Sequence, residues 1–214
     1  MFYHRKQANM AYQDGIGERG LTLGNTYFLP QIQFADNDRV VDCGANVGDL
    51  FQYFVQNEIQ IEYIGFEPSK LEYECLKSNV APGVTYNMGL WNSSDTLEFF
   101  SSSTGADSSL IQPPTYDEIV RVNVNRLDSL ISGKIKLLKI EAEGAEPEVL
   151  QGCENLLSEI EYISADLGFE RGVRQESTLA PVINFLLSRN FELIDVSHVR
   201  VVALFRNKII PARH

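Results

Sequence analysis

The stretch VVDCGANVGD, residues 40–49, predicts both a fold class and a binding site. Its first four residues are typical of a buried β-strand, and Gly44 allows a tight turn because glycine adopts backbone angles closed to other residues. A helix is expected to begin at about Gly48, and the free N–H groups at a helix N-terminus favour a carboxylate or phosphate. Asp42 ends the strand with a carboxylate that suits a cationic or hydroxyl-bearing group. The stretch therefore predicts an amino-acid-like ligand, with an ordinary strand-to-helix turn as the alternative.

The composition is that of a globular protein without a nucleic-acid partner. The chain has 214 residues, of which 44% are hydrophobic and 22% are charged, and its formal net charge is −11. Proteins that bind nucleic acids usually present a basic face, and docking on an anionic membrane also needs basic residues. No apolar run is long enough to span a bilayer, so membrane insertion is not expected. This length predicts one domain with a substantial core.

The three cysteines, Cys43, Cys75 and Cys153, lie far apart in apolar surroundings. Because there is no close cysteine pair, a metal site built on thiolates is not expected. Reduced core thiols, and a first segment without the apolar core of a signal peptide, together predict a cytoplasmic protein.

Alternating strands and helices predict an α/β fold with a parallel sheet. Short runs of β-branched and aromatic residues alternate with segments that carry apolar residues at helical spacing, which is typical of parallel strands joined by helical crossovers. The chain closes with two further strands that we expect to pair with each other. The expected strands of this sheet are residues 40–43, 61–66, 84–87, 136–140, 160–165, 191–196 and 199–205.

Two segments depart from this alternation. Residues 1–35 are poorly patterned and contain four glycines, so we interpret them as an N-terminal lid or packing arm before a single domain at 36–214. Residues 91–125 are expected to form an antiparallel insertion. The serine-rich stretch 101–109 within it is either a linker or a loop that lines a site for a hydroxyl-rich substrate.

Acidic residues end most of the predicted parallel strands: Asp42, Glu67, Glu141 and Asp166. Ligands of open α/β sheets bind outside the carboxyl ends of the strands, so these side chains are expected to surround a polar ligand. Glu67 follows Asp42 by about 25 residues, close to the spacing of the acid that binds ribose in nucleotide sites. Acids in the first turn of a helix are the alternative, because they are common at these places.

Several common site motifs are missing from the chain. The turn lacks the middle glycine of the dinucleotide fingerprint, which lets the backbone approach a pyrophosphate. Neither a P-loop motif nor a G-x-S-x-G nucleophile elbow occurs. The histidines, His4, His198 and His214, do not have the spacing of metal ligands. The sequence therefore disfavours a dinucleotide dehydrogenase, a P-loop protein and a serine hydrolase.

Three blocks of the sequence resemble the FkbM family of S-adenosylmethionine-dependent methyltransferases: VDCGANVG at 41–48, FEP at 66–68 and LKIEAEGAE at 138–146. Their order and spacing agree with the family, and the resemblance extends from about residue 36 to residue 206. It implies the class I methyltransferase fold, a Rossmann-like α/β fold with helices on both faces of a seven-stranded, mostly parallel sheet whose last strand is antiparallel. It also implies methyl transfer to a hydroxyl oxygen, commonly on a sugar, a glycan or a small polar metabolite.

The resemblance further implies a set of contacts to the cofactor S-adenosylmethionine. The methionine moiety is expected against the turn after the first strand, the ribose hydroxyls on the acid after the second strand, and the adenine after the third strand. The residues that the family pattern places there are Asp42, Gly44, Ala45, Asn46, Gly48, Glu67, Pro68, Met88, Gly89 and Leu90.

Glu141 is the first candidate for the general base that assists methyl transfer to a hydroxyl, and Asp166 is the second. The family usually has aspartate where this chain has Glu141, so the carboxylate is displaced by one methylene. Lys139 lies two residues earlier on the same side of the strand, and its pairing with Glu141 is expected to keep that acid ionised. An alternative in which Glu141 and Asp166 hold Mg²⁺ resembles catechol-type O-methyltransferases, but the expected site contains no metal.

The acceptor is the least defined part of the expected reaction. Candidate acceptor contacts are Ser108 and Ser109 in the serine-rich loop, Lys139, and Arg171, whose guanidinium suits an anionic sugar or phosphate. An O-methyltransferase acting on a glycan or small polar metabolite is the favoured function. Methyl transfer to nitrogen on the same scaffold and a non-catalytic S-adenosylmethionine-binding protein are the alternatives. The sequence does not indicate the oligomeric state.

Overall fold

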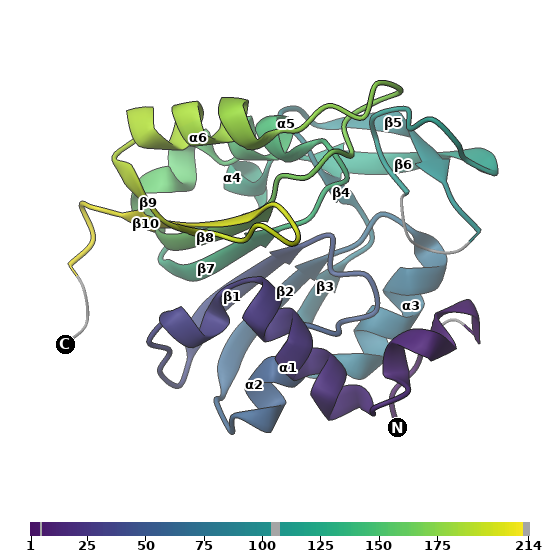
Figure 1. Cartoon of the computed structure of the whole chain (residues 1–214), viewed down its shortest axis with the longest axis horizontal. Helices are drawn as coiled ribbons and strands as arrows, with labels where there is room; N and C mark the ends of the chain where they lie inside the picture. Colours follow the sequence, from purple (N-terminus) through teal and green to yellow (C-terminus); the bar gives the residue numbers. More distant parts are fainter. Residues whose placement is uncertain (5, 104–107, 212–214) are drawn as a thin grey trace.

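A seven-stranded β-sheet forms the centre of the computed structural model, which describes residues 1–4, 6–103 and 108–211 (Figure 1). The strand order is β3-β2-β1-β7-β8-β10-β9, and neighbouring strands are parallel except where β10 pairs with β8 and β9. The expected mostly parallel sheet with an antiparallel last strand is therefore confirmed. The strands are β1 (Asp38–Cys43), β2 (Ile61–Phe66), β3 (Val84–Tyr86), β7 (Ile135–Ile140), β8 (Ile160–Asp166), β9 (Phe191–Val196) and β10 (Val202–Asn207).

Helices cover both faces of this sheet (Figure 1). One face carries α1 (Ile16–Thr26), α2 (Phe51–Gln56) and α3 (Lys70–Asn79), and the other carries α4 (Leu127–Leu130), α5 (Glu146–Gln151) and α6 (Leu179–Ser188). All six residues of β7 are buried, with Leu137 in the core beneath α1 and α2 and Leu138 in the core beneath α5 and α6. Burial on both faces is typical of a parallel sheet. Among the described residues, no helix combines the length and apolar character that crossing a membrane needs.

The N-terminal residues divide into a packed part and a part near the site. α1 packs closely on α2, since a Cβ added at Gly24 would lie 2.0 Å from Cδ2 of Tyr53. Tyr27, Leu29 and Ile32 follow α1, through the short 3-10 helix η2 (Leu29–Gln31), and are buried in the same core. Residues 16–32 are therefore built into the fold, whereas the 3-10 helix η1 (Lys6–Tyr12) precedes them on the surface. A further 3-10 helix, η3 (Glu154–Glu159), follows α5.

The insertion forms a separate three-stranded sheet of β4 (Gly89–Leu90), β5 (Asp95–Ser101) and β6 (Glu118–Asn125), in the order β4-β6-β5. β5 and β6 are antiparallel, as expected for residues 91–125, whereas β4 runs parallel to β6. Of the serine-rich stretch, residues 104–107 lie outside the described residues. Ser109 returns to β5 through a bridge with Phe100.

The largest differences from the expected element boundaries are at the starts of α2 and β10. α2 begins at Phe51 rather than near Gly48, because Asn46 and Gly48 have positive φ angles of 49° and 89° that a right-handed helix does not contain. β10 begins at Val202 rather than Val199, which lies fully exposed in the turn after β9. In both cases the turn is longer than the apolar pattern predicts.

We expect Gly24→Val to lower the free energy of unfolding by about 1–3 kcal/mol, because the added side chain meets the ring of Tyr53 and forces α1 away from α2. Urea denaturation measures this change. Thr22→Val is the matched control, since it places the same β-branched residue on the exposed side of the same helix. Equal losses in the two variants would show that packing of α1 against α2 at Gly24 does not set the effect.

Candidate active site

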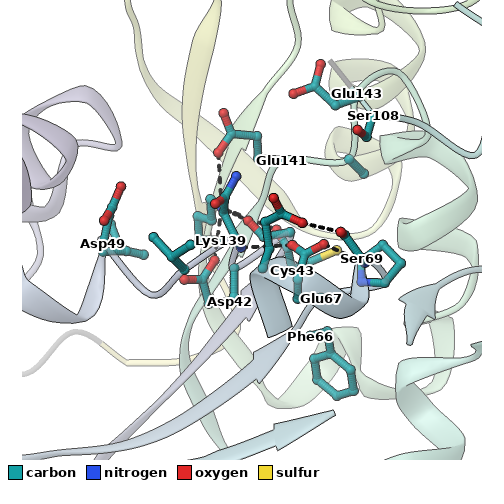
Figure 2. A pocket seen from close by; sticks show the side chains of 18 of the residues that line it. Asp42, Cys43, Asp49, Phe66, Glu67, Ser69, Ser108, Lys139, Glu141 and Glu143 are labelled. Carbon is teal, nitrogen blue, oxygen red and sulfur yellow. Dashed lines mark hydrogen bonds and ion pairs between the residues drawn. The ribbon is translucent and has the colours of Figure 1, made fainter. Parts of the chain in front are cut away.

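A cavity of about 700 Å³ lies at the carboxyl ends of β1, β2 and β7 (Figure 2). Ligands bind at this edge in open α/β sheets, and the volume is in the range of small-molecule sites. The structure brings most of the predicted site residues to the wall of this cavity: Asp42, Gly44, Ala45, Asn46, Glu67, Pro68, Gly89, Leu90, Ser108, Ser109, Lys139 and Glu141.

The remaining predicted residues, Gly48, Met88, Asp166 and Arg171, lie outside that wall. Gly48 faces α3, and Met88 packs against the central core. Asp166 is fully buried behind the cavity at the end of β8. Arg171 directs its guanidinium to the two carboxylate oxygens of Glu148, at 2.8 and 2.7 Å, so this cation is already paired.

The turn after β1 is fixed by backbone contacts to both neighbouring strands. The N–H groups of Gly44 and Ala45 both donate to the carbonyl oxygen of Phe66 at 3.0 Å, and the N–H of Glu141 donates to the carbonyl oxygen of Cys43 at 3.1 Å. Gly44 has a φ angle of 72°, and a Cβ at this position would lie 1.9 Å from the carbonyl oxygen of Glu141. The close approach of β1 and β7 therefore requires glycine here.

Glu67 joins the turn after β1 to the loop after β2. Its two carboxylate oxygens accept hydrogen bonds from the backbone N–H groups of Asn46, at 2.9 Å, and Ser69, at 2.8 Å. Burial raises the pKa of Glu67 to about 7, against the lowering effect of these two donors. The N–H of Asn46, in the turn before the expected start of the helix at Gly48, is thus satisfied by the protein itself.

Lys139 is the central cation of the site (Figure 2). Its ammonium lies 2.9 Å from Oδ1 of Asp42 and 3.2 Å from Oε2 of Glu141, and it donates to the carbonyl oxygen of Gly44 at 2.8 Å. The other oxygen of Asp42 accepts from the hydroxyl of Tyr63 at 2.7 Å. Burial alone would lower the pKa of Lys139, but the two carboxylates outweigh it and raise that pKa. The pairing of Lys139 with Glu141 expected from their spacing is present.

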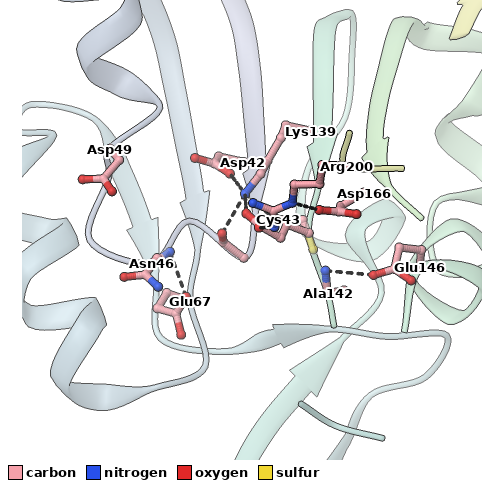
Figure 3. A network of polar contacts seen from close by, with 12 residues as sticks. Asp42, Cys43, Asn46, Asp49, Glu67, Lys139, Ala142, Glu146, Asp166 and Arg200 are labelled. Carbon is pink, nitrogen blue, oxygen red and sulfur yellow. Dashed lines mark hydrogen bonds and ion pairs between the residues drawn. The ribbon is translucent and has the colours of Figure 1, made fainter. Parts of the chain in front are cut away.

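Arg200 links the two predicted catalytic acids, although sequence reasoning did not identify it. Figure 3 shows its contact with Asp166. From the turn between β9 and β10, its guanidinium pairs with both Glu141 and Asp166. Burial would raise the pKa of Glu141, but Lys139 and Arg200 together hold it below its usual value. Burial raises the pKa of Asp166 in spite of Arg200, and its second oxygen accepts from the N–H of Gly168 at 3.1 Å. The place between the two acids that was considered for Mg²⁺ is taken by this guanidinium.

Glu146, the last residue of the third sequence block, fixes the loop after β7 (Figure 3). One carboxylate oxygen accepts from the N–H groups of Ala142, at 3.0 Å, and Gly144, at 3.1 Å, and the other accepts from the hydroxyl of Thr178 at 2.9 Å. This buried acid therefore shapes the loop that follows β7. It holds Glu141 at the cavity by fixing the backbone immediately after it.

The serine-rich loop reaches the cavity through Ser108 and Ser109. The hydroxyl of Ser109 donates to the carbonyl oxygen of Glu143 at 2.7 Å and accepts from the N–H of Ile111 at 3.0 Å. The hydroxyl of Ser108 accepts from the N–H of Ser102 at 2.9 Å. Both serines line the wall, and these bonds hold the loop against the segment after β7.

The N-terminal segment lies along one side of the cavity and is attached there to Asp49, the last residue of the stretch 40–49. Asp49 accepts from the hydroxyl of Tyr12 at 2.8 Å and pairs with the guanidinium of Arg19 at 3.1 Å. Met10 and other residues of η1 line the same wall. Sequence reasoning missed these contacts because residues 1–35 lack periodicity; the acid directly after the Gly48 turn was the available signal.

The charge of the wall suits S-adenosylmethionine. Among the residues that the structure describes, seven carboxylate side chains line the cavity: Asp42, Asp49, Glu67, Glu72, Glu141, Glu143 and Glu170. Such a surface favours a ligand with cationic groups, and the cofactor carries a sulfonium and an ammonium. The turn after β1 faces this cavity with Gly44, Ala45 and Asn46. The residues present therefore fit this cofactor.

The chain matches the Methyltransferase FkbM domain family over residues 42–193. It belongs to the FkbM methyltransferase family, whose methyl donor is S-adenosylmethionine, so the resemblance seen in the three sequence blocks is confirmed.

Individual relatives match at lower similarity. Methyltransferase sdnD of Sordaria araneosa is 30% identical over 159 residues, which cover 55% of this chain and 61% of that protein. The crystal structure of methyltransferase FkbM from Methylobacillus flagellatus KT has a TM-score of 0.59 at 18% identity, covering 83% of this chain and 45% of that chain. The N-terminal domain of human METTL16 in complex with SAH gives 0.50 at 12% identity, covering 92% and 71%. At these identities the structural likeness concerns the fold, and the chain spans only part of the first two relatives.

We expect Lys139→Met to lower the free energy of unfolding by about 3–5 kcal/mol, because it leaves the buried carboxylate of Asp42 without its counter-charge and Glu141 with Arg200 alone. It should also abolish binding of S-adenosylhomocysteine, since the turn at Gly44 loses its side-chain donor. Urea denaturation and calorimetric titration measure the two effects.

Lys136→Met is the matched control for this prediction. Lys136 is buried in the same strand and pairs with Glu161 at 2.8 Å, but it does not line the cavity. The control should lose stability and keep its affinity for S-adenosylhomocysteine. Unchanged binding in Lys139→Met, or equal loss of binding in both variants, would contradict the role assigned to Lys139.

Glu67 predicts a pH dependence of stability. Its pKa rises from 4.5 to about 7 on folding, so the contribution of its neutral form is complete below the lower value and is lost as the pH rises through the upper one. Over that interval the unfolding free energy of the wild type should fall by about 3 kcal/mol relative to Glu67→Gln, whose amide does not titrate. Urea denaturation of both proteins at several pH values checks this, and parallel pH curves would refute it.

Proposed function

We propose that this protein is an S-adenosylmethionine-dependent O-methyltransferase that acts on a hydroxyl of a sugar, a glycan or another small polar metabolite. The observation that carries the proposal is the cavity at the carboxyl ends of β1, β2 and β7, into which the three family blocks of the sequence project. The chain spans only part of the length of its matched relatives, so the activity of the whole protein is also proposed.

The proposed cofactor seat follows the order of the strands. The turn after β1 holds the methionine moiety, the loop after β2 holds the ribose, and β4 with the wall beside it holds the adenine. When bound, S-adenosylmethionine supplies a methyl group already activated on a positively charged sulfur. The residues assigned to the three parts are Gly44, Ala45 and Asn46, then Glu67 and Pro68, then Gly89 and Leu90.

The chain's own contribution is alignment and exclusion of water. Methyl transfer is an in-line displacement, so holding the acceptor oxygen in position supplies much of the rate. Glu141 and Asp166 are proposed to form, with Lys139 and Arg200, the fixed charges beside the reacting groups. The segment with η1 is proposed as a lid, because its residues line the cavity and Asp49 fastens it there.

The acceptor is proposed to be a neutral, hydroxyl-rich compound. An anionic acceptor would meet the carboxylate-rich wall, and Arg171, the cation considered for it, is paired with Glu148. Ser108 and Ser109 lie at the wall and can offer hydroxyl groups to such a compound. This favours sugars and polyols over phosphorylated acceptors.

The test is a methylation assay with S-adenosylmethionine labelled with ¹³C in its methyl group. The protein is incubated with neutral monosaccharides and polyols, with their amino-sugar counterparts, and with their phosphates. We expect O-methyl carbons in the ¹³C NMR spectra of neutral hydroxyl compounds, because N-methyl and O-methyl carbons differ in chemical shift. An N-methylated product would favour the nitrogen alternative, and binding of the cofactor without any product would favour a non-catalytic protein.

A pair of glycine variants controls for the cavity. Gly44→Ala places a Cβ 1.9 Å from a backbone oxygen and should lose cofactor binding and activity. Gly133→Ala imposes the same kind of strain, because Gly133 has a φ angle of 85°, but its nearest neighbour would be 3.6 Å away and it lies outside the cavity. Cofactor binding and activity that survive in both variants would contradict the role assigned to the turn at Gly44.

A further inference from the structure

Most of the carboxylates in the cavity wall are already engaged by the protein. Asp42 and Glu141 pair with Lys139, Asp49 with Arg19, Glu67 with two backbone N–H groups, and Glu72 with the hydroxyl of Ser69. Glu143 also has an interaction partner. The two cations beside Glu141 stabilise its ionised form and make it a weak proton acceptor, and both oxygens of Glu67 already accept hydrogen bonds from the backbone.

Glu170 differs from the others. It lines the cavity from the loop after β8, and within the described part of the chain no group donates a hydrogen bond to its carboxylate. Both acids lie beside Gly168: a Cβ there would lie 3.6 Å from Oε1 of Glu170 and 3.3 Å from Oδ1 of Asp166. Glu170 is therefore held close to a second acid with a free face towards the cavity.

The surroundings of Glu170 favour its protonated form. Burial raises its pKa to about 7, and the carboxylates of Asp166 at the end of β8, Glu146 in α5 and Glu141 at the end of β7 add to this, whereas Arg200 from the turn between β9 and β10 opposes it. A group with this pKa can take up a proton and release it again near neutral pH, which is the property of an efficient general base.

We propose that Glu170, rather than Glu141 or Asp166, is the general base that accepts the proton of the acceptor hydroxyl, and that Arg200 positions the acids around it. The proposal rests on the function proposed above. The acceptor oxygen bonds to the methyl carbon while the carbon–sulfur bond breaks and its electron pair stays on sulfur. The hydroxyl proton passes to the carboxylate of Glu170 and then to water, so the sulfonium becomes a neutral thioether and charge is conserved.

The first test needs no acceptor. The carboxyl carbons of ¹³C-glutamate-labelled protein are titrated by NMR, and the resonance of Glu170 is identified by its loss in Glu170→Gln. We expect this group to titrate near neutral pH, well above the usual range of a glutamate side chain. Glu176→Gln, at an exposed glutamate of the same loop, is the control for the assignment, because it should leave the resonance of Glu170 in place. Titration of Glu170 in the ordinary range of glutamate overturns the proposal.

The second test compares rates on the neutral acceptor found in the methylation assay. We expect Glu170→Gln to lower kcat by about 100-fold or more and to remove the rise of kcat through neutral pH. Its affinity for S-adenosylhomocysteine should stay unchanged, which shows that the variant is folded. Glu176→Gln should keep the wild-type rate and pH profile, and Glu170→Asp should recover part of the rate because it keeps a carboxylate.

The outcomes separate the two proposals. A wild type that methylates its acceptor while Glu170→Gln keeps the wild-type kcat overturns the role of Glu170 and leaves the proposed function standing. A wild type that binds S-adenosylhomocysteine and methylates no hydroxyl compound overturns the proposed function and, with it, this role for Glu170. A lower kcat in Glu170→Gln, together with loss of the rise of kcat through neutral pH, supports both the proposed function and the role of Glu170.

Discussion

The rest of the site depends on the contacts of the buried ammonium of Lys139. It reaches two carboxylates, Asp42 and Glu141, and the carbonyl oxygen of Gly44 at the same time, and so ties the end of β7 to the turn after β1. Removing a charge from water is costly, and the cost is offset only when the geometry satisfies the ion on several sides. Here the register of the sheet supplies that geometry, because Asp42 and Lys139 are direct partners across β1 and β7.

From Lys139, charges of alternating sign extend across four neighbouring strand ends. Asp42 belongs to β1, Lys139 and Glu141 to the end of β7, Asp166 to β8, and Arg200 to the turn before β10. Each charge stabilises the next, so the row is rigid and its carboxylates stay ionised or occupied. A base must instead be a group that does not pair with this row of charges. The proposed proton acceptor, Glu170, therefore lies in the loop after β8 and not at a strand end.

The parts of the molecule that were predictable from sequence are those with local causes. Apolar runs in β1, β2, β7 and β8 mark the strands because both faces of the sheet are buried, and Gly44 marks the turn because its backbone angle and close contact admit no side chain. Arg200, Glu170 and Tyr12 come from turns or unpatterned segments, and only the tertiary fold brings them to the cavity. The helix expected at Gly48 begins later because the residues before it have positive φ angles. The spacing of apolar residues does not reveal such angles, so this boundary was not predictable.

This arrangement explains why position 141 carries glutamate and not aspartate. Its carboxylate touches Lys139 with one oxygen and Arg200 with the other, so it spans a cation of β7 and a cation of the turn between β9 and β10. The family's more usual aspartate is one methylene shorter, and a carboxylate drawn back by that length would be less able to reach both partners at once. The longer side chain therefore suits a bridge between fixed charges better than a mobile proton acceptor. The departure from the family pattern and the low basicity of Glu141 have the same origin, and both leave the proton to a residue outside the bridge.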